Sequence, residues 1–407
     1  MEFLKSWARA LKFNKSPTKK KPEENENENN NISNNNETNQ NIKPSQTQTT
    51  NENTNNSTDV NKTSTTTTST TTIQINSNQN GASTDSINSS SSGSSISNSD
   101  IKVNKDELFS IDFSSFSKNK KELIECSLII FEETGITKHL DIDRAIMERY
   151  LYRVKEAYRD NPFHSFNHAV TVTQMIFLII IKTQLLNILT PMEKLAILIA
   201  SVCHDLDHPG LNNRFQINIK SELAQLYNNK SVLENHHLQQ CLQTLHEQSG
   251  KDLLSKLSET EREILYDQVK VLILATDMEN HFMYKEKFDQ IIPVFDWQNK
   301  DHRELLLIML LKSADISNEL RSWEVSSKWA NALMQEFFNQ SDLEKENNLP
   351  LTPFMVREKV VLNSTQVSFI DKFLLPTYQA LQNILPPLSV FIERINQNRQ
   401  VWEAVQS

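Results

Sequence analysis

Glycine is scarce in this chain of 407 residues, and its scarcity excludes several kinds of nucleotide-binding site. Only five glycines are present, and after residue 100 only Gly135, Gly210 and Gly250 remain. Neither a G-x-G-x-x-G turn nor a G-x-x-x-x-G-K-[ST] loop can be built from them, although both motifs need glycines so that the backbone can approach phosphate groups. Nucleotide recognition of the Rossmann or P-loop kind is therefore excluded.

Cysteine is also rare, and no transmembrane segment is expected. Cys126, Cys203 and Cys241 lie far apart and form no C-x-x-C pair, which argues against a disulfide framework. No secretory signal is recognised, so we expect a cytoplasmic protein. The most apolar run, "MIFLIIIKTQLLNIL" from residue 175 to 189, is broken by Lys182 and Gln184 and is too short to span a bilayer. We predict that it is a core helix.

Aromatic residues are absent from residue 23 to 100, where runs such as "NNNISNNN" and "TSTTTTSTTT" dominate. Such a segment cannot bury enough apolar surface to offset its chain entropy, so we predict a disordered Asn/Ser/Thr-rich linker at residues 17–104. Residues 1–16 differ, because Phe3, Leu4, Trp7 and Leu11 share one helical face among basic residues. Two interpretations remain open for this segment: weak contact with an anionic membrane or a partner, or a frayed end without function.

Residues 105–407 remain for one large folded domain, and this domain lacks a basic surface signal. The formal charge of the chain is −9; residues 1–100 carry 9 basic and 10 acidic side chains, which leaves 33 basic and 41 acidic side chains elsewhere. An acidic body without a basic stripe predicts no nucleic-acid partner. The sequence carries no signal for an oligomeric state.

Helical periodicity dominates this domain. In "LSETEREILYDQVKVLILATD" apolar residues recur three and four positions apart, whereas strict alternation is hardly seen. Thr190 followed by Pro191 is typical of a helix start, and Pro209 with Gly210 is typical of a chain leaving a helix. We therefore predict an all-α, compact multi-helix domain.

Six of the ten histidines fall into three short clusters: "FHSFNHA", "CHDLDH" and "LENHH". His164 and His168 are four residues apart and are expected to share one helical face. Asp315 interrupts the apolar helix "LLKSADISNE". Taken singly, a histidine pair is more often a satisfied core or surface feature, and an aspartate at a helix end more often caps it. Taken together in an all-helical domain, these residues favour a metal site.

The residue types suit a hydrolytic metal centre. Two neutral imidazoles and two carboxylates give mixed nitrogen and oxygen ligation that leaves positions open for water, as hydrolytic Zn²⁺ requires. A harder ion such as Mg²⁺ (or Mn²⁺) needs few protein ligands and could share Asp205. Two such ions would acidify a bridging water and clamp a phosphoryl group, while an unligated histidine protonates the leaving oxygen.

The order HxxxH, HDxDHPG, LENHH, LATDM, ADISN and TQVSFID resembles the class I 3′,5′-cyclic nucleotide phosphodiesterases, which belong to the HD-domain metallohydrolases. The resemblance extends from about Phe163 to Pro376. Within the family, "LILATDMENHF", "ADISNELRSWEV" and "FFNQSDLEKENNLPLTPFM" look most like the cGMP-selective ninth phosphodiesterase group.

The resemblance implies a role for each matching residue. The zinc ligands would be His168, His204, Asp205 and Asp315, with Asp205 shared by the second ion. His164 would be the general acid toward O3′, and His208 would lie against the bridging hydroxide and the phosphate. Glu234 and Thr276 would orient water and the acid. Of His236 and His237, one would lie behind the ligands and the other would be structural, and Asp207 would support the turn.

The same resemblance implies a purine pocket. The base would stack on Phe369 opposite Leu333 and hydrogen-bond Gln366, and an aromatic face with an aliphatic one suits a flat purine. Because a glutamine amide presents either a donor or an acceptor, Gln366 alone cannot choose between adenine and guanine. The expected preference for cGMP rests on the resemblance around Glu319. Two departures are Phe337, which replaces the tyrosine of the ninth group in this pocket, and Ser165, which replaces the asparagine usual after the acid.

The function implied is hydrolysis of a 3′,5′-cyclic nucleotide to its 5′-monophosphate, with cGMP favoured over cAMP, which would terminate cyclic-nucleotide signalling. A cAMP-preferring or dual-specificity phosphodiesterase is the first alternative. Another HD-type nucleotide phosphohydrolase would share the metals but would not predict Gln366 and Phe369. A catalytically dead sensor would tolerate loss of a ligand or of the acid, and none is lost.

Overall fold

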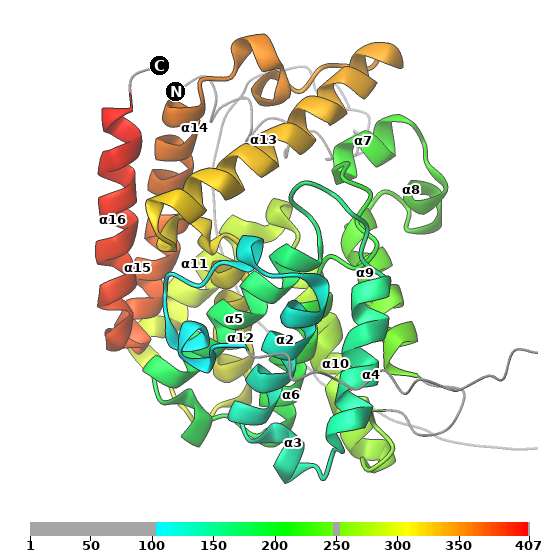
Figure 1. Ribbon diagram of the computed structural model, residues 1–407, viewed down its shortest axis with the longest axis vertical. Helices are drawn as coiled ribbons and strands as arrows, with labels where there is room; N and C mark the ends of the chain where they lie inside the picture. The colour runs from blue at the N-terminus through cyan, green and yellow to red at the C-terminus, as the bar shows by residue number, and fades with distance from the viewer. Residues whose placement is uncertain (1–102, 247–252, 406–407) are drawn as a thin grey trace, which may run out of the picture. The chain divides into compact units, whose positions relative to one another are not determined.

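The protein is all-α within residues 103–246 and 253–405, the part that the computed structural model describes (Figure 1). No strand occurs in these ranges, which confirms the predicted fold class. The predicted amphipathic segment at residues 1–16 lies outside them, as does nearly all of the predicted linker at residues 17–104. The helices run in the order α2 Lys120–Glu133, α3 Ile136–His139, α4 Arg144–Glu156, α5 Phe166–Lys182, α6 Pro191–Cys203, α7 Asn213–Asn218, α8 Glu222–Leu226, α9 Val232–Leu245, α10 Glu259–Ala275, α11 His281–Ile291, α12 Lys300–Asp315, α13 Trp323–Glu346, α14 Leu362–Phe369, α15 Leu375–Ile384 and α16 Ser389–Ala404.

Local capping explains where several of these helices begin. The Thr190 hydroxyl accepts a hydrogen bond from the backbone of Glu193, whose carboxylate accepts one in return from the backbone of Thr190, and Pro191 is the first residue of α6. This reciprocal arrangement satisfies two amides that the first helical turn cannot pair internally. The predicted start of α6 is therefore confirmed.

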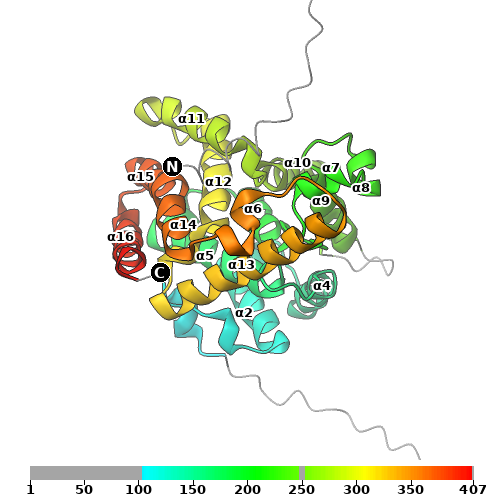
Figure 2. The ribbon, with the colours of Figure 1, turned by 90° about the horizontal axis from the view of Figure 1, so that it is seen from above.

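Helix α5 lies at the centre of the core. Fourteen of its 17 residues are buried, and it packs against α2, α6 and α12. Seen from above, α5 and α12 lie near the middle of the bundle, with α2, α4, α11 and α16 around them (Figure 2). The prediction of one core helix across residues 175–189 was wrong at its C-terminal end. The helix stops at Lys182 because Gln184 adopts a left-handed backbone with φ 58°, and a short 3₁₀ turn, Leu185–Asn187, follows.

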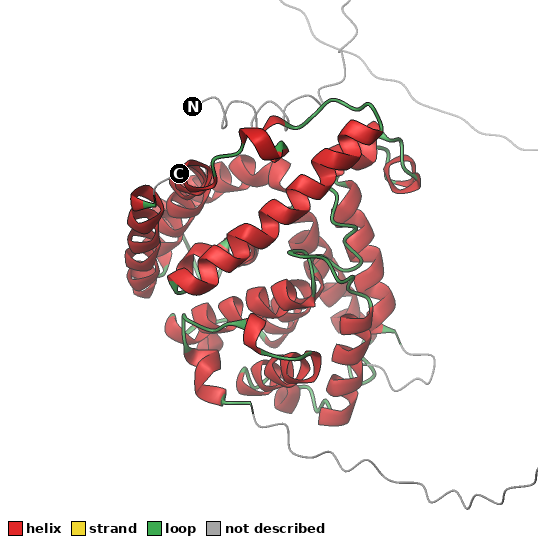
Figure 3. Cartoon of the chain, turned by 45° about the horizontal axis from the view of Figure 1, so that its top comes forward, coloured by secondary structure: helices red, strands yellow, loops and turns green. Residues whose placement is uncertain are grey.

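The long helix α13 lies across one end of the bundle, where Figure 3 shows it as the diagonal helix. After it, the chain forms a 3₁₀ turn at Pro353–Met355 and then α14, which continues into α15 through one wide π-helical turn, Ile370–Leu374. Helix α16 packs along both α14 and α15. In the described part of the chain, no helix combines the length and the apolarity that crossing a bilayer would require.

Candidate active site

A cavity of about 340 Å³ opens between α13 and the ends of the central helices. The segment after α6, the first turn of α9, the C-terminal ends of α10 and α12, and one face of both α13 and α14 contribute to its walls. The cavity is lined by every residue that the sequence analysis assigned to catalysis or to the purine pocket. These residues therefore share one surface. Of the four predicted metal ligands, Asp205 and Asp315 line the cavity, while His168 and His204 lie fully buried behind it.

The four predicted metal ligands converge on one point. The Nε2 atoms of His168 and His204 are 3.3 Å apart, and Asp315 Oδ1 lies 3.1 Å from the first and 3.2 Å from the second. Asp205 Oδ2 lies 3.1 Å from His204 Nε2 and 3.5 Å from His168 Nε2. The four ligand atoms all lie within 4.8 Å of one another. The sequence therefore identified a set of side chains that can hold a metal ion.

The chemistry of this set fits a divalent cation. His204 Nδ1 donates a hydrogen bond to the carbonyl of Ser201 at 2.9 Å, which leaves the Nε2 lone pair facing the cluster. Asp205 Oδ2 is buried and accepts no hydrogen bond. Burial lowers the pKa of His204, but the carboxylates of Asp205 and Asp315 outweigh burial and hold that pKa well above its usual range. The carboxylates thus create a strongly negative point that a cation can occupy in place of the imidazole proton.

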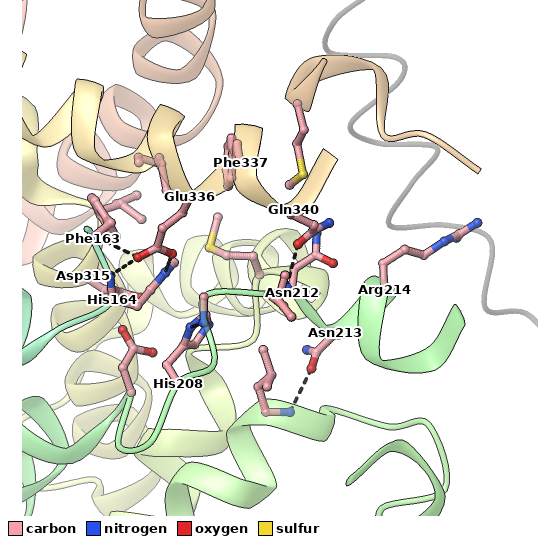
Figure 4. Close-up of a pocket in the computed structure, with 18 of the residues that line it drawn as sticks. Phe163, His164, His208, Asn212, Asn213, Arg214, Asp315, Glu336, Phe337 and Gln340 are labelled. Atoms are coloured by element: carbon pink, nitrogen blue, oxygen red, sulfur yellow. Dashed lines mark hydrogen bonds and ion pairs between the residues drawn. The ribbon is translucent and has the colours of Figure 1, made fainter. Parts of the chain in front are cut away.

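His164 lies beside this cluster and pairs with Glu336 of α13 (Figure 4). Its Nδ1 is 2.6 Å from Glu336 Oε2, and Glu336 Oε1 accepts the backbone N–H groups of Phe163 and His164. Burial lowers the pKa of His164, but the Glu336 carboxylate more than offsets it and raises the pKa to about 9. The imidazole is therefore protonated at neutral pH, with Nδ1 engaged and Nε2 left to act as a donor.

His164 and His168 do not share a helical face, so that prediction was wrong. Helix α5 begins only at Phe166, because Ser165 is extended with φ −139° and ψ 174°. His164 therefore lies in the preceding segment, where Asn161 Nδ2 donates to its carbonyl at 2.8 Å. The two imidazoles still approach each other, with ring centroids 6.0 Å apart. Asn161 thus braces the segment that carries His164.

The turn after α6 places His208 over His164. Their rings stack with centroids 3.9 Å apart, and His208 Nδ1 accepts the N–H of Gly210 at 3.0 Å. Asn161 Nδ2 also donates to the carbonyl of His208 at 2.7 Å, so one amide holds both histidine segments. Burial and the neighbouring His164 charge keep the pKa of His208 well below its usual range. A neutral His208 and a charged His164 are consistent with different roles.

Glu234 and Thr276 lie on the wall nearest to Asp205. Glu234 accepts both hydrogen bonds of the Asn213 amide group, and burial with the nearby Asp277 charge raises its pKa to about 8. Thr276 ends α10 and donates its hydroxyl to the carbonyl of Ile273, so its oxygen can accept a further hydrogen bond. Both side chains can therefore bind water in the cavity.

The two histidines of the "LENHH" cluster, His236 and His237, lie in different surroundings. His237 Nδ1 donates to the carbonyl of Leu206 at 2.7 Å, and its Nε2 lies 3.8 Å from Asp205 Oδ1 on the cavity wall. His236 instead bonds Asp207 at 2.8 Å, and the same carboxylate pairs with Arg159 at 2.6 Å. Asp207 thus ties the turn to α9 and to the segment after α4, away from the metal-capable cluster. The structure agrees with a supporting position for Asp207.

Part of the cavity lining is apolar. Phe369 and Leu333 contribute to it from α14 and α13, and Phe337 packs edge-on against Phe354 with centroids 5.8 Å apart. Gln366, on the same helix as Phe369, is also buried and lines the cavity. A flat ring with hydrogen-bonding edges fits such a surface.

Glu319 is held more firmly than the sequence suggested. Its Oε2 accepts the indole N–H of Trp402 at 2.8 Å and the hydroxyl of Ser326, and burial raises its pKa. The residue lines the cavity while its carboxyl group is anchored to α16. Contact with a base would therefore involve the other carboxyl oxygen.

Glu336 was missed by the sequence analysis, although it contacts the predicted acid directly. Along α13 it begins a row of buried polar residues at four-residue spacing, Glu336, Gln340 and Glu344. Buried carboxylates on one helical face need partners, so this row was the signal available in the sequence. Asn161 gave no comparable signal, because asparagine is common in loops.

A family model for 3′5′-cyclic nucleotide phosphodiesterases matches residues 163–395, which is more than half of the chain. The chain belongs to the cyclic nucleotide phosphodiesterase family. The matched region contains the metal-capable cluster, the His164–Glu336 pair and the apolar part of the cavity lining.

Curated phosphodiesterases resemble the chain over most of its length. The Dictyostelium discoideum "cGMP-specific 3′,5′-cGMP phosphodiesterase 3" is 63% identical over 305 residues, which cover 75% of this chain and 65% of the relative. The mouse "High affinity cGMP-specific 3′,5′-cyclic phosphodiesterase 9A" is 37% identical over 283 residues, covering 70% of this chain and 52% of the relative. The chain thus spans just under two thirds of the first relative and about half of the second.

Solved phosphodiesterase domains share the fold. The phosphodiesterase domain of the rhodopsin phosphodiesterase fusion protein from the choanoflagellate Salpingoeca rosetta is 34% identical, with a TM-score of 0.70. The match covers 73% of this chain and 95% of that domain. The all-α fold of the described residues is therefore that of a phosphodiesterase domain.

Proposed function

We propose that this protein hydrolyses 3′,5′-cGMP to 5′-GMP, with cGMP preferred over cAMP. The observation that carries the proposal is the arrangement of one cavity. The His164–Glu336 pair, two of the four metal-capable side chains, and Gln366, Phe369 and Leu333 all line it, with His168 and His204 directly behind. A phosphodiester and a purine base would each find a matching surface there. The cGMP preference is supported by the names of the two relatives described above.

Two divalent cations, Zn²⁺ and Mg²⁺ (or Mn²⁺), are the proposed cofactors. His168, His204, Asp205 and Asp315 would hold the zinc, with Asp205 shared by the second ion, because mixed imidazole and carboxylate ligation suits zinc. When bound, such ions lower the pKa of water and stabilise negative charge on phosphoryl oxygens. Glu234 and Thr276 would orient water from the adjacent wall.

His164 is the proposed general acid. Its Nδ1 is occupied by Glu336, so Nε2 is the atom that can pass a proton to the O3′ leaving group. His208 stacks on it and would hydrogen-bond the phosphate, while Phe369 and Leu333 would enclose the base and Gln366 would bond its edge. Glu319 and Phe337 complete the proposed purine pocket.

The cytosol is the proposed location. All three cysteines are buried free thiols in the structure, as is usual in a reducing compartment. Residues 105–407 are the proposed catalytic domain, which would need no nucleic-acid partner.

Paired initial-rate measurements on the full chain test the proposed function. With Mg²⁺ or Mn²⁺ present, cGMP should have the higher kcat/KM, and thorough chelation should abolish hydrolysis of both cyclic nucleotides. A rate that chelation leaves unchanged would contradict the metal mechanism. A preference for cAMP would contradict only the assignment of substrate.

A further inference from the structure

A fully buried carboxylate that does not line the cavity connects two of its walls. Glu344, near the C-terminal end of α13, is 0% exposed. Its Oε1 accepts hydrogen bonds from Gln340 Nε2 at 2.8 Å and from the Thr352 hydroxyl at 2.9 Å, and its Oε2 accepts the Thr352 backbone N–H at 2.8 Å. All three groups, which belong to Gln340 and Thr352, donate their hydrogens to the carboxylate, so the side chain at position 344 must supply acceptors.

The first partner, Gln340, also bonds the cavity wall that follows His208. Because Gln340 gives its amide N–H to Glu344, its amide oxygen faces the other way and accepts the backbone N–H of Asn212 at 2.8 Å. Figure 4 shows this bond joining α13 to the segment that follows His208. Gly210, Leu211 and Asn212 all line the cavity. Glu344 therefore fixes the orientation of the Gln340 amide, so that its oxygen is the atom that bonds this wall.

The second partner, Thr352, belongs to a different cavity wall, which includes Phe354 and Met355. Thr352 is bound through both its backbone and its hydroxyl, and the N–H of Leu349 donates to the Glu344 carbonyl at 2.8 Å. The chain that returns from α13 is thereby held against the helix immediately before Phe354 and Met355, which line the cavity. Phe354 contacts Phe337, so the position of this loop affects a residue of the proposed purine pocket.

We propose that Glu344 is a positioning residue for substrate binding, which sets the spacing between the Gly210–Asn212 wall and the Thr352–Met355 wall. The inference rests on the proposed function and adds a positioning contact outside the cavity. It assigns Glu344 to substrate affinity and not to the chemical step, because none of its partners contacts His164 or the four metal-capable side chains. Hydrogen bonds to a carboxylate are about twice as strong as neutral ones, so their loss loosens both walls.

The test compares Glu344→Gln with Glu346→Gln in the full chain. Glu346 lies two residues away on the same helix but is exposed, so it undergoes the same chemical change without the network. In Glu344→Gln, the new amide group faces a donor whichever way it turns. We expect the KM for cGMP to rise roughly fivefold or more with kcat within about twofold, the pattern of lost binding energy. Glu346→Gln should match the wild type in both constants.

Two further measurements keep the proposal testable if one variant folds poorly. Thr352→Val removes the hydroxyl but keeps the shape of the side chain, and it should raise KM in the same direction by a smaller factor. Combined with Glu344→Gln it should add less than its separate effect, because the two groups share one network. Hydrogen exchange of the Asn212 and Thr352 amides should accelerate in Glu344→Gln and not in Glu346→Gln.

Faster exchange with an unchanged KM would show that Glu344 only stabilises the fold, and a fall in kcat at constant KM would place it in the chemical step. Either result overturns the proposal. If the wild type hydrolyses no cyclic nucleotide, the proposed function fails instead. Exchange at the Asn212 and Thr352 amides then still decides whether Glu344 orders both walls.

Discussion

The contact between His164 and Glu336 shows how one carboxylate can set the protonation state of the histidine that we propose as the general acid. The His164 side chain is 24% exposed, whereas Glu336 is almost completely buried and accepts two backbone N–H groups besides the imidazole. These bonds, and the His164 charge, hold the pKa of Glu336 below its usual range despite burial. The pair therefore keeps a proton on His164 in the pH range where free histidine loses it.

The first prediction concerns Glu336→Gln. The raised pKa of His164, about 9, means that its charged form is fully present below about pH 6.5. That form is lost as pH rises through about 9. Without the Glu336 charge, burial and the remaining charges of Asp205 and Asp315 determine the pKa of His164, and burial lowers it. We expect the alkaline limb of kcat/KM to move to lower pH by more than about one unit. A pH–rate profile with an unmoved alkaline limb would contradict this assignment.

Single residues also mark how far the sequence was informative. The four metal-capable residues His168, His204, Asp205 and Asp315 could be predicted because they match a family motif whose residue types suit metal binding, and the structure brings them together. Glu336 could not be paired with His164, because 172 residues separate them and only the packing of α13 joins them.

Among local elements, the turn between His204 and Gly210 contains two residues with a left-handed backbone, Asp207 and Gly210. Gly210 has φ +72°, a left-handed conformation, and a Cβ there would lie 3.2 Å from Asn161 Oδ1. Asn161 in turn holds the carbonyls of His164 and His208. A side chain at position 210 would therefore strain the backbone and also push on the residue that braces both histidines.

The second prediction compares Gly210→Ala with Gly135→Ala. Gly135 has a similar φ of +73°, but a Cβ added there would have no neighbouring atom within 4 Å, so this variant carries the backbone cost alone. Both variants should lose about 1–2 kcal/mol of unfolding free energy, measured by denaturant titration. Only Gly210→Ala should also lose most of its kcat. Equal activities in the two variants would show that the Asn161 contact is unimportant.

Element type was easier to predict than element boundaries. Apolar periodicity identified an all-helical fold because it reflects burial, which every core helix shares. The start of α6 could be predicted from Thr190 and Pro191, whose effects are local. The start of α5 could not, because it depends on contacts of His164 with Glu336, which is 172 residues away in the sequence, as well as with nearby Asn161.

Across the whole molecule, the metal-capable cluster joins α5, the end of α6 and the end of α12. His168 and Asp315 are 147 residues apart in sequence and 3.1 Å apart in space. Ligands so far apart are brought together only by the folded state, so metal binding stabilises that state relative to the unfolded chain.

The third prediction follows for stability. Thorough chelation should lower Tm by at least about 5 °C, because an ion present at 100 times its Kd contributes about 2.7 kcal/mol. Readdition of Zn²⁺ should restore the wild-type Tm. Asp315→Asn, which removes one ligand charge, provides the control, and its Tm should respond much less to chelation. A wild-type Tm insensitive to both treatments would contradict a resident ion.

The wide turn at Ile370–Leu374 also sets the angular phase of the helices on either side of it. Each residue added to or removed from an α-helix rotates everything beyond it by about 100°. A π-helical turn closes its hydrogen bonds over five residues and not four, so this turn takes up one residue more than an α-helical turn would. A residue inserted or removed between Phe369 and α15 that the turn did not take up would swing Gln366 and Phe369 away from the cavity. The direction in which these two side chains point is thus encoded by the length of this segment as well as by its composition.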